Sequence, residues 1–171
     1  MRKLVLLMLV LSSLVACKNQ TLDKEGVHNI LEKSGKYPII HSRNIYTKDS
    51  EDGRKLLDAG LEKDGLVSVE RNRKAGDNHA PVIEFSADAK SFFLAPDKGQ
   101  LSSVQKVKTA EEVLDEITAL KTNEKGDVAA ASYTTKFINI TPFAKLEKND
   151  FSAGKQYTVK LILTDKGWNL E

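Results

Sequence analysis

The N-terminal segment constrains the fold most, because it decides how much of the chain is available to fold. Arg2 and Lys3 precede a nearly unbroken apolar run from 4 to 15. A dozen helical residues would be about 18 Å long, well short of the ~30 Å hydrocarbon core of a bilayer. A short apolar run behind basic residues is typical of an export signal. We therefore expect residues 1–16 to be a cleaved signal peptide.

The apolar run ends in the sequence Leu14-Val15-Ala16-Cys17. This tetrapeptide resembles the lipobox of bacterial lipoproteins, which places a leucine three residues before an invariant cysteine. The resemblance implies transfer of a diacylglycerol to the Cys17 thiol, cleavage between Ala16 and Cys17, and acylation of the new amino group. Cys17 is the only cysteine of the chain, so the mature body has no thiol for a disulfide, a zinc site or a nucleophile. Two or three acyl chains would make the anchor effectively permanent.

The residue that follows the cysteine is Lys18 and not aspartate. In lipoproteins of bacteria with two membranes, an aspartate there tends to retain the protein in the inner membrane. The resemblance therefore implies an outer-membrane anchor on the periplasmic face. Residues 17–23 form the expected lipidated tether, in which five extended residues reach at most about 18 Å. The folded body should lie close to the bilayer.

The charge balance argues against nucleic acid as a partner. The chain has 26 Lys and Arg against 24 Asp and Glu, a net charge of +2. Removing Arg2 and Lys3 with the signal lowers the 26 basic side chains to 24, equal to the acidic ones. We expect membrane attachment through the acyl chains on Cys17 and no nucleic-acid partner.

Two helices and a hairpin are predicted in the first half of the mature chain. Apolar residues recur there at helical spacing behind the capping candidates Thr21 or Asp23 and Asp49 or Ser50. The predicted elements are a helix over 24–34 ended by Gly35, a helix over about 51–63, and a hairpin of strands 66–70 and 82–85.

Residues 54–90 resemble the helix, Gly-Leu turn and wing of winged-helix regulators, with Gly65-Leu66 at the turn and 82–86 closing the hairpin. The resemblance implies a recognition helix in the major groove and contacts of Arg71, Arg73 and Lys74 with phosphates. The helix is rich in acidic residues, which would repel phosphate, and an exported protein is separated from the chromosome. We expect winged-helix-like topology without DNA binding. The basic loop could instead be solvated or contact anionic lipid head groups.

The second half is predicted to be a helix followed by strands. Thr109 and Glu112 have capping-box spacing ahead of an apolar pattern, which predicts a helix over 109–120. Alternating apolar residues predict strands over 128–141, 155–164 and 168–170. The expected fold class is α+β, with a helical and hairpin subdomain over 24–100 and a helix packed on an antiparallel sheet over 101–171. The two parts could also form one continuous domain.

The sequence presents no catalytic, cofactor-binding or metal-binding motif. His28, His41 and His79 are the only histidines, and none has a partner at zinc-site spacing. Asp77-Asn78-His79 carries possible ligand atoms, but these residue types also suit an ordinary turn. No serine nucleophile elbow and no glycine-rich phosphate loop occurs. Cys17, as a lipidation site, is the one functional residue predicted.

The expected function is that of a lipid-anchored envelope protein acting as a non-catalytic binding or adaptor module for a protein or cell-wall partner. The alternative is an envelope hydrolase with a carboxylate or histidine site. A deep pocket with converging acidic or histidine side chains would favour the hydrolase. An exposed apolar patch or an unpaired sheet edge would favour the binding module.

Overall fold

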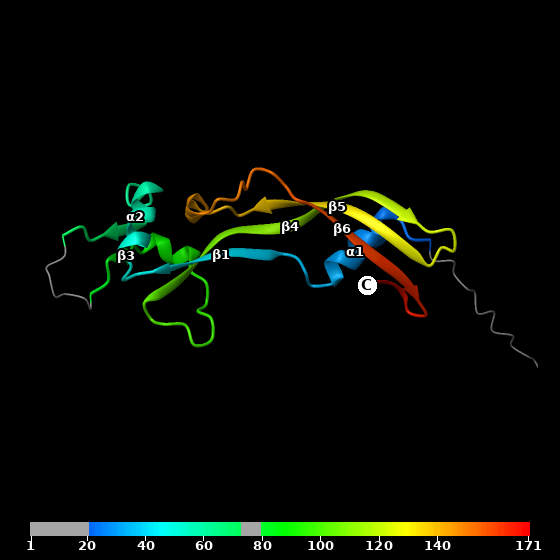
Figure 1. The fold of residues 1–171 in the computed structure, drawn as a ribbon, viewed down its shortest axis with the longest axis horizontal. Coiled ribbons are helices and arrows are strands. Elements are labelled where there is room, and N and C mark those ends of the chain that lie inside the picture. Colours follow the sequence, from blue (N-terminus) through cyan, green and yellow to red (C-terminus); the bar gives the residue numbers. More distant parts are fainter. Residues whose placement is uncertain (1–20, 73–79) are drawn as a thin grey trace, which may run out of the picture.

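The computed structural model describes residues 21–72 and 80–171, which form a long, narrow body (Figure 1). The helices and strands of these residues follow one another along the chain. They are α1 (Lys24–Lys33), β1 (Ile39–Tyr46), α2 (Ser50–Asp58), β2 (Val67–Val69), β3 (Ile83–Phe85), the 3-10 helix η1 (Asp88–Phe92), β4 (Val104–Thr122), β5 (Val128–Ile138), the 3-10 helix η2 (Pro142–Leu146), β6 (Gln156–Thr164) and β7 (Gly167–Leu170).

A curled antiparallel sheet in the order β1-β4-β5-β6-β7 forms the frame of the described body. Its 19-residue strand β4, at ~3.3 Å per residue, is about 60 Å long. The first part of β4 pairs with β1 and the later part with β5, and the two pairings overlap in the middle. A separate hairpin of β2 and β3 lies at the end of the body where α2 packs (Figure 1).

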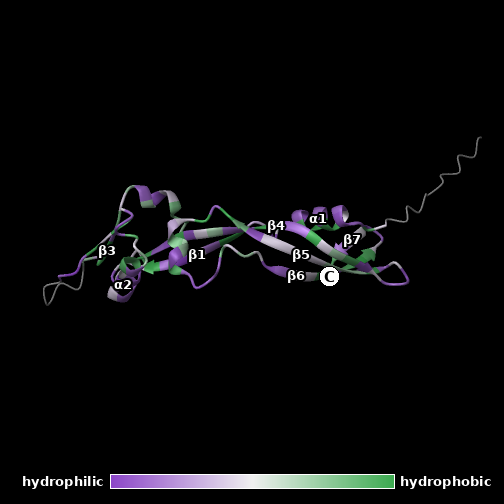
Figure 2. Ribbon diagram, turned by 90° about the horizontal axis from the view of Figure 1, so that it is seen from above, coloured by the Kyte–Doolittle hydropathy of each residue, from purple (hydrophilic) through white to green (hydrophobic). Residues whose placement is uncertain are grey.

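Two hydrophobic cores lie along this frame, and β4 contributes to both. The α2 core gathers around α2, β2, β3 and the two 3-10 helices, and its buried members are Ile45, Leu56, Leu61, Leu66, Val67, Val69, Val82, Ile83, Ala89, Val107 and Phe143. The α1 core lies between α1 and β4 to β6, and its buried members are Leu22, Val27, Leu31, Ile117, Ala129, Ala131, Tyr133 and Leu161. Figure 2 shows the two ends from above, with green apolar segments at each.

The first predicted helix is confirmed, and its boundaries have local causes. The carboxylate of Asp23 accepts a hydrogen bond from the Gly26 amide at 2.7 Å, which caps the first turn of α1. Val27 and Leu31, four residues apart, are buried on the face that packs on the sheet. Gly35 has a φ of 70°, a left-handed conformation that favours glycine and ends the helix.

The second helix and the hairpin also form, and the helix is shorter than predicted. Asp49 caps α2 through the Glu51 amide at 2.8 Å, and the helix ends at Asp58 and not near residue 63. Gly60 and Gly65 have φ values of 75°, so the chain turns twice there before it enters β2. Strands β2 and β3 pair antiparallel as predicted.

The helix predicted over 109–120 is wrong, because this segment is the middle and end of β4. Glu112, expected to cap a first turn, is a strand residue paired with Ile39 on one side and Phe137 on the other. Thr109 lies at a bulge opposite β1, where the register shifts between His41 and Ser42. Pairing with two neighbouring strands outweighs the helix propensity of this segment.

The expected fold class is therefore corrected. The described residues form a mostly antiparallel half-barrel with two α-helices, and not a helix-rich winged-helix unit followed by a helix on a sheet. The physical reason is that residues 109–120, expected as a helix, belong to β4 and pair with β1 and β5. Strands near those predicted over 128–141, 155–164 and 168–170 are present as β5, β6 and β7. The division of the chain near residue 100 stays a prediction.

Candidate functional site

A buried carboxylate at the middle of the sheet is the chemically most distinctive feature of the described residues. Only 1% of Glu112 is exposed to solvent. Its Oε1 accepts hydrogen bonds from the Thr135 hydroxyl at 2.7 Å and the Tyr157 hydroxyl at 2.9 Å. Its Oε2 lies 2.9 Å from His41 Nε2 and accepts a hydrogen bond from Lys155 Nζ at 3.2 Å. We call these five residues the Glu112 cluster.

Each partner of the carboxylate comes from a different place in the sheet. His41 lies in β1, Thr135 in β5 and Tyr157 in β6, while Lys155 immediately precedes β6. Glu112 itself lies in β4, so its two oxygens join four neighbouring strands. The cluster therefore connects the elements at the point where the pairing partner of β4 changes from β1 to β5.

The surroundings of Glu112 keep it ionised. Burial by itself would raise its pKa, but the hydrogen bonds from Thr135, His41, Tyr157 and Lys155 outweigh burial and lower the pKa from 4.5 to about 2. Burial, and then the hydrogen bond to Glu112, raises the pKa of Tyr157. A general acid needs a proton near neutral pH, and this carboxylate holds none. The arrangement suits a structural carboxylate.

Aromatic rings enclose the histidine and the lysine of the cluster. The His41 ring lies edge-on to Phe137 and Phe151, with centroid distances of 5.3 Å and 6.1 Å. Lys155 Nζ lies 5.2 Å from the centroid of the Phe137 ring, within the range of a cation–π contact. These contacts hold the His41 ring and the Lys155 side chain in place.

A second aromatic group extends the Glu112 cluster towards α1. Tyr133, fully buried, stacks on Tyr157 at a centroid distance of 5.5 Å, and its hydroxyl lies 3.1 Å from that of Tyr37. Lys36 Nζ donates to the Tyr133 hydroxyl at 3.2 Å. Burial, followed by the hydrogen bond with Tyr133, raises the pKa of Tyr37. The stacking of Tyr133 on Tyr157 thus joins the Glu112 cluster to the α1 core.

The residues singled out from the sequence do not meet at one place. Cys17, Arg73, Lys74 and the segment 77–79 lie outside the described residues. His28, on the surface of α1, lies 3.8 Å from Glu32, and Arg71 pairs with Glu62 next to the β2–β3 hairpin. Among residues 21–72 and 80–171, no three His, Cys, Asp or Glu side chains are placed to hold a metal ion.

The face of the sheet opposite the Glu112 cluster carries exposed apolar side chains. Ile40 in β1, Glu111 in β4 and Ile138 in β5 lie side by side in the strand register. Ile40 is 42% exposed, and Ile138 and the nearby Ile140 are also exposed. β1 is an edge strand of the sheet, and Tyr46 at its end is 49% exposed. Exposed apolar side chains therefore lie on both sides of Glu111, whose carboxylate pairs with Lys108, and they reach the sheet edge at β1.

Comparison with known proteins gives no information on function, so the functional argument rests on the geometry of the structure. No protein-family model, no curated protein and no solved structure matches this chain. In the part of the chain that the structure describes, neither helix is long and apolar enough to cross a membrane.

Proposed function

We propose that this chain is a lipid-anchored protein of the bacterial cell envelope that acts as a non-catalytic binding or adaptor module. The lipobox-like sequence Leu14-Val15-Ala16-Cys17 supports the anchor, which would consist of acyl chains on Cys17. Lys18 supports an outer-membrane location on the periplasmic face. The partner would be a protein or a cell-wall component.

The observation that carries the proposal is the position of the expected tether at one end of a long body. The described chain begins at Thr21, at the end of the body formed by α1, the β4–β5 turn and the β6–β7 turn (Figure 1). The α2 core lies at the opposite end, and β4, about 60 Å long, connects the two. An anchor at one end of a long body suits a protein that presents a contact surface to other envelope components.

The edge strand β1 is the contact surface that we favour. Edge strands offer unpaired backbone groups to which an extended segment of another protein can add. The exposed side chain of Ile40 would supply an apolar contact to that segment, whereas the Tyr46 amide at the far end of β1 already donates to Asp52 at 2.9 Å. We therefore propose a protein partner that docks at the β1 edge.

The hydrolase alternative would depend on a carboxylate and a histidine, for which the described residues offer Glu112 and His41. The Glu112 oxygens already accept hydrogen bonds from Thr135, Tyr157 and Lys155 and face His41. A substrate would have to displace these partners, and the pKa of about 2 leaves the carboxylate without a proton to donate. These contacts favour the binding module.

Site-specific crosslinking in cells tests the proposed docking edge. A photo-reactive amino acid at Ile40 is expected to give a reproducible adduct with one envelope protein, because an extended partner segment would run alongside this residue. The matched control places the same amino acid at Leu101, which is 69% exposed but lies in the loop before β4. An adduct of equal yield at Leu101, or no adduct at Ile40, would contradict the proposal.

A further inference from the structure

A cleft of about 430 Å³ lies at the end of the body where the described chain begins. It is formed by the residues before α1, by the β4–β5 turn and by the β6–β7 hairpin. Its lining includes Thr21, Leu22, Thr122, Lys125, Leu163 and Trp168. Apolar side chains therefore share the mouth of this cleft with a lysine.

The apolar side of the cleft continues the α1 core to the surface. Leu163 in β6 pairs directly with Trp168 in β7, so the two side chains lie on the same face of the sheet. Leu161, two residues earlier in β6, lies on that face and is fully buried. Leu163 itself is 39% exposed. The row of apolar side chains thus runs out of the core and reaches solvent at this end.

The proposed anchor would hold this cleft next to the membrane. Three residues lie between Cys17 and Thr21, so the four backbone steps from one to the other span at most about 14 Å. Acyl chains on Cys17 must lie in the bilayer, and Leu22, the next residue after Thr21, is packed into the α1 core. The tether is therefore too short to lift this end of the body far from the lipid head groups.

We infer that the cleft end of the body docks on the phospholipid bilayer, with Leu163 and Trp168 at the level of the head groups and glycerol and Lys125 near the phosphates. Tryptophan favours this interface because its ring is apolar and its N–H is polar. A lysine can keep its ammonium group among the phosphates while its stem lies along apolar surface. The inference rests on the proposed lipid anchor, which supplies the high local concentration of bilayer that a small contact area needs.

Fluorescence quenching by lipid tests this contact, because Trp168 is the only tryptophan in the chain. The lipidated mature protein, which begins at Cys17, would be reconstituted into phosphatidylcholine vesicles that carry bromine near the top of one acyl chain. Emission from Trp168 is expected to be clearly weaker than in vesicles without bromine, because bromine quenches only at close approach. Quenching that is absent, although the protein floats with the vesicles, would overturn the inference.

Two variants distinguish docking from simple tethering. Leu163→Glu places a charge at the cleft mouth and should remove most of the quenching while flotation stays unchanged. Leu101→Glu adds the same charge at an exposed position before β4 and should leave the quenching as it is. Equal quenching in the wild type and the Leu163→Glu variant would also overturn the inference. A wild-type protein that fails to float would instead overturn the proposed anchor itself.

Discussion

Replacing Glu112 with alanine is expected to lower the free energy of unfolding by about 3 kcal/mol, because the change leaves buried polar groups without their hydrogen-bond acceptor. The variant leaves Lys155 and His41 without their carboxylate and leaves the hydroxyls of Thr135 and Tyr157 without an acceptor. It also leaves a void where four strands meet. Urea unfolding followed by circular dichroism measures the loss.

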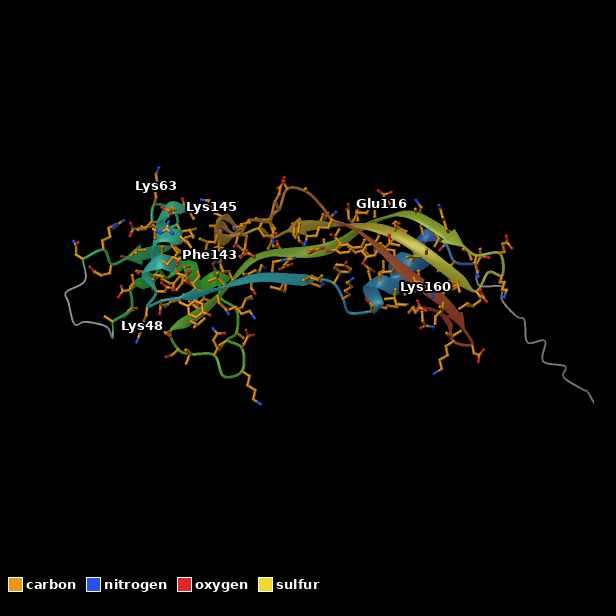
Figure 3. All side chains as sticks on the ribbon, in the orientation of Figure 1. Lys48, Lys63, Glu116, Phe143, Lys145 and Lys160 are labelled. Atoms are coloured by element: carbon orange, nitrogen blue, oxygen red, sulfur yellow. The ribbon has the colours of Figure 1, made fainter. Side chains whose placement is uncertain are left out.

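The matched control lies in the same strand. Glu116, labelled in Figure 3, is an exposed residue in the later part of β4. Glu116→Ala should therefore change the free energy of unfolding by less than about 0.5 kcal/mol. If Glu112→Ala has an effect as small as that of Glu116→Ala, the Glu112 cluster does not hold the strands together as described.

The same carboxylate gives the protein a characteristic response to acid. Folding lowers the pKa of Glu112 from 4.5 to about 2. The carboxylate therefore contributes its full stabilisation at a pH above 4.5. That contribution is lost as the pH falls through the interval between 4.5 and about 2. Unfolding free energies at about pH 6 and about pH 3 should therefore differ more in the wild type than in Glu112→Gln.

Replacing Phe143 with alanine is expected to cost about 3–5 kcal/mol of unfolding free energy, because the change empties the middle of the α2 core. Phe143, labelled in Figure 3, is fully buried. Its ring contacts Phe92 and Phe85 at centroid distances of 5.9 Å and 6.3 Å. Thermal unfolding followed by circular dichroism measures the loss, and Trp168 emission follows the opposite end of the body.

A nearby exposed residue provides the control for this second variant. Ile140 lies three residues before Phe143 and is exposed, so Ile140→Ala should leave the stability within about 0.5 kcal/mol of the wild type. A loss in Phe143→Ala that does not exceed the loss in Ile140→Ala would contradict the placement of Phe143 in the α2 core.

The parts of the fold that the sequence predicts well depend on local signals. The helix α1 begins behind the capping carboxylate of Asp23 and ends at Gly35, and both signals act within a few residues of the helix. Strand β6 follows from the alternation of apolar and polar residues from Tyr157 to Leu161, in which Leu161 is buried and its neighbours Lys160 and Ile162 are not. Such elements need little information from distant parts of the chain.

The prediction for β4 failed where distant pairing decides the structure. Thr109 and Glu112 have the spacing of a helix cap, but Glu112 instead meets Lys155, which lies 43 residues later, and His41, which lies 71 residues earlier. Bulges in β4 also break the alternation that would have indicated a strand. The burial of a glutamate among a lysine, a histidine and two hydroxyls leaves no local pattern in the sequence.

Mass spectrometry of the protein purified from membranes tests the central claim, an anchored body that begins at Cys17, most directly. The account predicts a mature N-terminus at Cys17 that carries two or three acyl chains. The Cys17→Ser variant is expected to lack these chains and to lose stable membrane attachment. An unmodified Cys17 in the membrane-bound wild type, or acyl chains retained on the Cys17→Ser variant, would contradict the account.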